Sequence, residues 1–122
     1  MKPELNTEKS IYLQIAESIE DDILRRTVDE ESQAPSTNQL AAMYRINPAT
    51  AAKGINILVS DGTLYKKRGL GMFVSSGAVE RIKKKRREAF FGRYIEPLLD
   101  EASNLDLPKD EIIRMIKEDG GK

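Results

Sequence analysis

Apolar residues near the start of the chain recur at the spacing of a helix. Isoleucine occupies every fourth position of one stretch: Ile11, Ile15, Ile19 and Ile23. This spacing places them on one face of a helix of about four turns over residues 10–26. The acidic side chains of the stretch are then expected to face solvent: Glu17, Glu20, Asp21 and Asp22. A polar connection without periodicity follows over residues 27–35.

Two short helices are predicted next, each with a recognisable start. Ser36 and Gln39 have the spacing of a capping box, and the helix they begin should end near Tyr44. Asn47 is a good N-cap, and the proline that follows it is tolerated in the first turn of a helix. This second helix should end around residues 61–62. Its buried face carries four apolar residues: Ala51, Ile55, Leu58 and Val59.

Gly54 lies in the middle of that second helix. Glycine at such a position costs about 1 kcal/mol relative to alanine. A close approach of another backbone would explain its presence.

A short antiparallel hairpin is predicted after the helices. Residues 63–66 and 72–75 are β-prone, and the connection between them contains Gly69 and Gly71. Two glycines in so short a connection indicate a hairpin turn with special backbone angles. A helix-turn-helix followed by a basic hairpin suits duplex DNA, because the helix fits the major groove and the hairpin tip reaches the adjacent backbone or groove.

A long helix is expected from about residue 79. It is basic over residues 83–87, and Pro97 should kink it or loosen one turn. A final short helix follows residues 105–108. We interpret the apolar residues of this tail as the contact of a two-fold dimer, the alternative being that the tail folds back as monomer core. They are Phe91, Tyr94, Ile95, Leu98, Leu99, Ala102, Ile112 and Ile116.

Together these elements predict a mainly α fold with a small β-hairpin wing. We expect a winged helix-turn-helix DNA-binding domain over residues 1–76, followed by a short all-helical dimerisation tail over residues 77–122. The length of 122 residues suits one modest domain with an appendage.

The net charge of zero conceals a segregation of charge along the sequence. Residues 1–35 hold four Lys/Arg against nine Asp/Glu, residues 36–87 hold eleven against two, and residues 88–122 hold five against nine. The middle block therefore has a net charge of +9 between flanks of −5 and −4. A polyanion bound on one surface would explain this block, and solvated helix faces are the alternative.

The composition argues against catalysis and metal binding. The chain has neither cysteine nor histidine, which excludes disulfides, thiolate zinc sites and histidine-based triads. We expect no catalytic residues, no metal, no cofactor and no enzymatic activity. No apolar run approaches the roughly 18 residues of a membrane span, and the start lacks a secretory signal pattern. We therefore expect a cytoplasmic protein without a membrane partner.

Four segments match the parts of a known DNA-binding domain in order and spacing. They are IYLQIAESIEDDIL, PSTNQLA, INPATAAKGINILVSDGTL and KKRGLGMFV. On these segments, residues 11–75 resemble the DNA-binding domain of GntR-family bacterial transcription regulators, as its first helix, second helix, recognition helix and wing. The tail sequence EPLLDEASNLDLPKDEIIRMI resembles the YtrA subfamily. That likeness implies dimerisation through these helices and regulation of transporter genes.

Two departures from the family pattern bear on how DNA would be read. Asn38 stands where the family usually has an arginine that contacts DNA, and the wing has Leu70 and Met72 where basic residues and threonine are frequent. Neither departure changes the expected fold. Both affect which operator sequence is bound.

Candidate DNA contacts come from three parts of the sequence. The start of the second helix and Arg45 in the turn are expected to hold phosphates. Asn47, Thr50 and Lys53 would project from the recognition helix toward base edges. The hairpin tip would approach the backbone or the minor groove. Ordinary capping by Asn47 and a solvated Lys53 are the alternatives. The full set is Ser36, Thr37, Asn38, Arg45, Asn47, Thr50, Lys53, Lys66, Lys67, Arg68 and Gly69.

The expected function is that of a homodimeric, sequence-specific transcription regulator, most simply a repressor. It would bind palindromic double-stranded DNA with its two recognition helices about one turn, ~34 Å, apart. The alternative is a winged-helix module that binds protein and has weak or lost DNA reading. A small-molecule effector of unidentified chemistry would act between the tails or at their junction with the winged domain.

Overall fold

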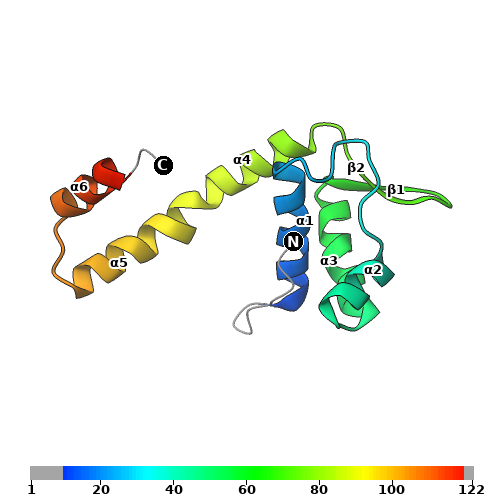
Figure 1. Ribbon diagram of the computed structural model, residues 1–122, viewed down its shortest axis with the longest axis horizontal. Coiled ribbons are helices and arrows are strands. Elements are labelled where there is room, and N and C mark those ends of the chain that lie inside the picture. The colour runs from blue at the N-terminus through cyan, green and yellow to red at the C-terminus, as the bar shows by residue number, and fades with distance from the viewer. Residues whose placement is uncertain (1–9, 120–122) are drawn as a thin grey trace. The chain divides into compact units, whose positions relative to one another are not determined.

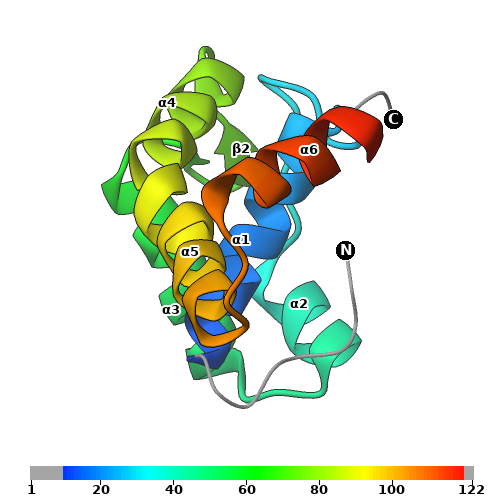
Figure 2. The same ribbon diagram turned by 90° about the vertical axis from the view of Figure 1, so that its left-hand side faces the viewer.

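The described residues fall into two compact units, which divide between Lys84 and Lys85. Figure 1 and Figure 2 show the computed structural model, which describes residues 10–119. The division falls inside α4 (Ala78–Phe90), later than the expected domain end at residue 76. The first turns of α4 belong to the first unit because three of their residues are buried in its core: Ala78, Val79 and Ile82.

Three helices surround the core of the first unit: α1 (Ile11–Leu24), α2 (Thr37–Tyr44) and α3 (Pro48–Ser60). Helices α1 and α3 lie side by side in both views (Figure 1 and Figure 2). The predicted isoleucine face of α1 is buried except at Ile11, which is 40% exposed at the start of the helix. On α3 the predicted apolar face is also buried, and only Val59 is partly accessible.

The prediction that all acidic side chains of α1 face solvent is wrong for two of them. Glu20 and Asp22 are buried. The chain that leaves α1 turns back against it, and the N–H groups of Thr27 and Val28 donate to the carbonyl oxygen of Asp22 (2.9 and 3.3 Å). Periodicity within a helix carries no information about cover supplied by residues outside it.

The close approach predicted at Gly54 is confirmed. A Cβ atom at this position would lie 2.8 Å from the backbone oxygen of Tyr12 and 3.1 Å from Cβ of Ile15. Gly54 therefore lets α3 pack directly onto the backbone of α1. This contact fixes the position of α3, which carries several of the candidate DNA contacts.

The predicted helix caps are also present. The Ser36 hydroxyl accepts from the N–H of Gln39 (3.1 Å), and the Gln39 amide oxygen accepts from the N–H of Ser36 (2.8 Å). The side-chain oxygen of Asn47 accepts from the N–H of Ala49 (2.8 Å). These bonds satisfy N–H groups that the first turns of α2 and α3 leave without helical partners.

The wing consists of β1 (Leu64–Lys67) and β2 (Gly71–Val74), paired antiparallel. Their register runs from Leu64 opposite Val74 to Lys67 opposite Gly71. The connection between them is residues 68–70, shorter than the predicted residues 67–71. Pairing of the two strands therefore reaches closer to the basic tip than the sequence pattern indicated.

The polar stretch before α2 is also part of the wing. Gln33 pairs with Phe73 in an isolated antiparallel bridge. The N–H of Ala34 donates to the oxygen of Met72, and the N–H of Val74 donates to the oxygen of Ser32, both at 2.9 Å. The sequence pattern predicted only a connection here, because this pairing is made by backbone groups and needs no apolar alternation.

The second unit contains the end of α4, a π-helical turn η1 (Phe91–Ile95), α5 (Glu96–Asn104) and α6 (Lys109–Asp119). The loosened turn expected from Pro97 is this π-helical turn, in which the N–H of Glu96 bonds to the oxygen of Phe91. Proline lacks the N–H that an α-helix would use there. Among the described residues, no helix combines the length and apolarity needed to span a membrane.

Candidate nucleic-acid interface

The start of α2 presents a helix N-terminus with polar side chains around it. Ser36 is exposed but its hydroxyl is engaged in the capping box. Thr37 is half-buried and Asn38 is exposed on the first turn. Backbone N–H groups at such a position attract anions, because the helix dipole adds to their partial charge. The local geometry is therefore suited to a phosphate.

Arg45 forms the turn between α2 and α3. Its backbone is left-handed (φ 55°, ψ 50°), and its N–H donates to the oxygen of Ala41. The next residue, Ile46, donates to the same oxygen at 3.0 Å and is half-buried. The guanidinium of Arg45 is on an exposed residue, so a rigid turn presents a positive charge between the two helices.

Asn47 is the N-cap of α3, and Thr50 and Lys53 lie within the helix. Capping by Asn47 is confirmed, and this occupies its side-chain oxygen. Thr50 is half-buried, whereas Lys53 is exposed. The ammonium of Lys53 lies 4.2 Å from the centre of the Tyr12 ring, which is a cation–π contact.

The tip of the wing is basic. Lys66 and Arg68 are exposed, and the ammonium of Lys67 lies 4.2 Å from the centre of the Phe73 ring. Gly69 has φ 79°, and nothing lies within 4 Å of the position a Cβ would take. Glycine is therefore needed here for its backbone conformation, and the tip has open space beside it for another molecule.

Gln33 is a supporting residue that the sequence did not indicate. Its side-chain amide donates to the backbone oxygen of Leu70 at 2.7 Å, across the base of the tip. A Cβ at Gly71 would lie 2.9 Å from the nitrogen of that amide. Gly71 thus makes room for the Gln33 side chain. No local pattern could reveal this pair, because Gln33 lies in a polar stretch far from the wing in sequence.

Glu30 and Arg81 anchor the start of α4 to the rest of the first unit. The carboxylate of Glu30 accepts from the N–H groups of Gly77 (2.9 Å) and Val79 (3.0 Å). These two bonds, that of Val79 first, lower the pKa of Glu30 below its ordinary value. The guanidinium of Arg81 donates to the oxygen of Gly62 (2.6 Å), just after the end of α3. The sequence singled out neither residue.

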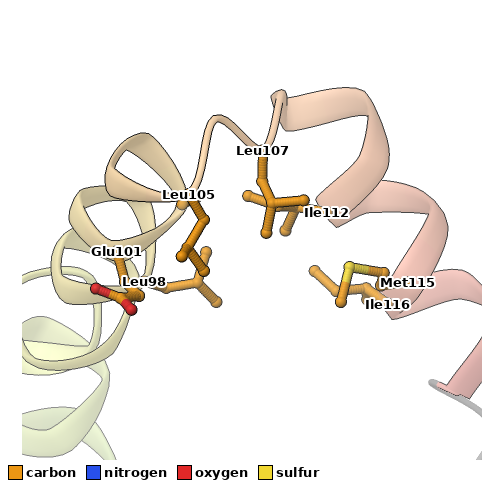
Figure 3. A pocket seen from close by; sticks show the side chains of 8 residues that line it. Leu98, Glu101, Leu105, Leu107, Ile112, Met115 and Ile116 are labelled. Atoms are coloured by element: carbon orange, nitrogen blue, oxygen red, sulfur yellow. The ribbon is translucent and has the colours of Figure 1, made fainter.

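The tail residues predicted to form a dimer contact differ in exposure within their own unit. Phe91, Tyr94, Leu98 and Ile116 are between 41% and 58% exposed, whereas Ile95, Leu99 and Ile112 are half-buried and Ala102 is buried. A groove of about 580 Å³ opens between α5 and α6. Figure 3 shows its apolar side chains turned toward one another from the two helices and the connection between them, with Glu101 at its edge. The second unit therefore leaves a large apolar surface open.

Comparisons with known proteins point to one family. The family described as bacterial regulatory proteins, gntR family, matches residues 11–74. The chain is similar to the crystal structure of a GntR-family transcriptional regulator of Bacteroides thetaiotaomicron, with 36% identity and a TM-score of 0.71 over 88% of this chain and 94% of that one. It is also similar to the DNA-binding domain of AraR in complex with operator ORX1, with 29% identity and a TM-score of 0.52 over 62% of this chain and 92% of that one.

A longer curated relative shares only part of its length with this chain. It is the probable fructoselysine utilization operon transcriptional repressor of Escherichia coli, 34% identical over 70 residues. These residues are 57% of this chain and 29% of that protein. The likeness therefore concerns the shared part alone.

Proposed function

Because the chain belongs to the GntR family of bacterial regulatory proteins, we propose that it is a sequence-specific DNA-binding transcription regulator. The observation that supports this most directly is the exposed basic set formed by Arg45, Lys53, Lys66 and Arg68. These residues lie on the turn, α3 and the wing, and each of these elements also contributes apolar side chains that pack in or against the core, such as Ile46, Leu58 and Val74. Exposed basic residues on successive elements of one domain are typical of a domain that binds a polyanion.

In the proposed complex the start of α3 enters the major groove. Asn47 keeps its amide nitrogen as a donor after capping, and Lys53 supplies an ammonium farther along the helix. The start of α2 and Arg45 hold phosphates, while Lys66 and Arg68 reach the backbone or minor groove beside them. Asn38 supplies an amide where most relatives have an arginine, so the sequence bound differs from theirs. The similar AraR domain is described in complex with an operator, which supports binding of operator DNA by this chain.

We further propose a homodimer that recognises a palindromic operator. The apolar tail surface supports self-association, because large exposed apolar patches are unusual on monomeric proteins. A two-fold dimer would set the two recognition helices about one DNA turn apart. We assign the chain to the YtrA-like subfamily by its helical tail, and propose that it represses transporter genes in the cytoplasm. A small-molecule effector bound at the tail would act by changing the distance between the two recognition helices of the dimer.

Substitution of two basic residues tests this function. Duplexes that bind the full chain are first selected from a random pool at low ionic strength. Lys53→Ala and Arg68→Ala should each weaken the best duplex about five- to tenfold, in line with one lost charged contact. Lys117→Ala, which removes an exposed lysine in the last turn of α6, is the matched control and should leave affinity unchanged. Fluorescence anisotropy gives the dissociation constants.

The salt dependence of the DNA affinity provides a second test of the same interface. Each phosphate contact releases counterions, so log affinity should fall linearly with log salt, and more gently in the Arg68→Ala variant. Equal affinities for wild type, Lys53→Ala and Arg68→Ala would contradict the proposed contacts. Failure of the wild type to select any duplex would favour a winged-helix module that binds protein.

A further inference from the structure

Leu70 is an apolar side chain at the tip of a basic hairpin. It is 64% exposed, which is the highest exposed fraction among the exposed large apolar side chains of residues 10–119. Its neighbours in the connection are Arg68 and Gly69, and Lys67 ends β1 beside them. Its side chain is therefore open to contact, and a partner that covers it would remove apolar area from water.

The backbone of Leu70 is held on both sides. Its N–H donates to the oxygen of Lys67 (2.9 Å), and its carbonyl accepts from the side chain of Gln33 (2.7 Å). Gly71 leaves the space that the Gln33 amide occupies. The leucine is thus presented on a backbone that is ordered before any partner arrives, which reduces the entropy lost on binding.

A partner that fits this tip must offer negative charge and an apolar surface within a few ångströms of each other. The minor groove of duplex DNA does so, since phosphates line its rims and sugar C–H groups form its walls. At A·T pairs its floor carries only acceptors, whereas a G·C pair adds the amino group of guanine. An aliphatic side chain cannot accept from that amino group, and burying an unpaired donor is costly.

We propose that Leu70 is a specificity-determining residue of the wing, which packs against the minor groove at A·T pairs and discriminates against G·C pairs. This inference rests on the proposed function, because it requires that the wing meets DNA. Within that function it assigns a base-pair preference to one residue at the tip of the wing. Arg68 supplies attraction that is independent of sequence, and Leu70 supplies the choice of base pair.

Modified bases test the proposal without altering the major groove. In the best duplex selected by the full chain, adenines at the pairs covered by the wing are replaced one at a time by 2,6-diaminopurine. This base adds an amino group to the minor groove and leaves the major-groove edge of adenine intact. Wild-type affinity should fall about tenfold at one or two of these pairs, as expected for one buried unpaired donor.

Leu70→Ala is the decisive variant. It should bind the diaminopurine duplex and the unmodified duplex within about twofold of each other. Leu13→Ala, which truncates an exposed leucine of α1, is the matched control and should keep the tenfold difference. Replacement of guanine by inosine at a neighbouring pair should improve wild-type binding and leave Leu70→Ala unchanged.

Two results would overturn the proposal. One is a Leu70→Ala variant that discriminates against diaminopurine as strongly as the wild type does. The other is a wild type that is indifferent to the added amino group at every pair. In both cases binding of duplex by the wild type would still stand, so the proposed function would survive. If the wild type selects no duplex, both the function and this inference fail together.

Discussion

Single residues decide how closely the helices of the first unit approach one another. Gly54 places α3 directly against the backbone of α1, with 2.8 Å between the position of a Cβ and the Tyr12 oxygen. Since backbone cannot move aside as a flexible side chain can, any larger residue must push the helices apart. The ammonium of Lys53 meets the Tyr12 ring beside this contact.

Gly54→Ala should therefore destabilise the protein despite the better helix propensity of alanine. The propensity gain of about 1 kcal/mol is outweighed by overpacking, which costs about 1–3 kcal/mol and more against backbone. We expect the free energy of unfolding in urea to fall by about 1–2 kcal/mol. Gly92→Ala is the control, because nothing lies within 4 Å of its Cβ position. It should be neutral or slightly stabilising, and equal losses in the two variants would refute the argument.

Glu30 gives the stability a dependence on pH. Its pKa is lowered from 4.5 by the N–H groups of Val79 and Gly77. A lowered pKa means that the ionised carboxylate stabilises the folded state above pH 4.5, and that this stabilisation disappears as pH falls through the folded-state pKa. Glu30→Gln should lower the free energy of unfolding at pH 7 by at most about 1 kcal/mol, because the group is well solvated.

The measurement compares urea unfolding of wild type and Glu30→Gln from pH 7 to pH 3 at one protein concentration. The difference between them should shrink toward zero below pH 4.5. A constant difference across the range would mean that Glu30 acts through packing and not through its charge.

Residues whose partners lie nearby in sequence could be predicted, and those with distant partners could not. The roles of Ser36 and Asn47 as caps follow from residues two and three positions away. Gln33 and Glu30 act on Leu70 and on the start of α4, which nothing local indicates. The burial of Glu20 was missed as well, because the sequence pattern assigned every acidic residue of α1 to the solvent-facing side.

At the scale of elements, short helices depend on how their ends are satisfied. Helix α2 spans only Thr37–Tyr44, too short to be stable without caps and packing. Its capping box uses both Ser36 and Gln39. Ser10 stands at the equivalent position before α1, but its side chain makes no capping hydrogen bond. The two serines form a natural comparison.

Ser36→Ala should lower the free energy of unfolding by about 1 kcal/mol, the usual cost of losing an N-cap. Ser10→Ala should change it by no more than a few tenths. Thermal and urea unfolding monitored by circular dichroism distinguish these outcomes. If both substitutions had the same small effect, the capping box would not be a significant source of stability for α2.

Element boundaries were predictable where side chains mark them and less so where backbone geometry does. The helix starts at Ser36 and Asn47 were predicted because capping residues are specific. The paired strands are residues 64–67 and 71–74, and each is shifted by one residue toward the hairpin tip from the predicted 63–66 and 72–75. The glycines of the connection tolerate several turn lengths, so the sequence did not fix this boundary. The π-helical form of the turn before Pro97 was not predicted, since a kink and a widened turn relieve the same missing N–H.

At the scale of the whole molecule, the second unit has an apolar surface that its own residues leave exposed. Leu98, Leu105 and Ile116 line the groove between α5 and α6 and are 41–58% exposed. The rings of Phe90 and Tyr94 pack in a tilted arrangement with 5.3 Å between their centres, and both are exposed as well. This surface was the basis of the proposed dimer.

Leu98→Glu should shift the protein from dimer to monomer, because a carboxylate in a buried apolar contact is strongly unfavourable. Sedimentation velocity at several concentrations measures the change, and the dimer dissociation constant should rise at least a hundredfold. Ser103→Glu adds the same charge at an exposed position of α5 and should leave the dimer intact. A wild type that is monomeric throughout would exclude the proposed dimer.

The pairing of residues 32–34 with β2 also restricts how the chain can change in length. Surface connections usually accept insertions, but an extra residue between Ser32 and Pro35 would reverse which side chains point inward along that stretch. Ala34 would leave the core, and the side chain of Gln33 would lose its hydrogen bond to the backbone oxygen of Leu70. The connection is therefore expected to vary in length before Glu30. One residue added between Ser32 and Pro35 would remove the contacts that hold the tip of the wing.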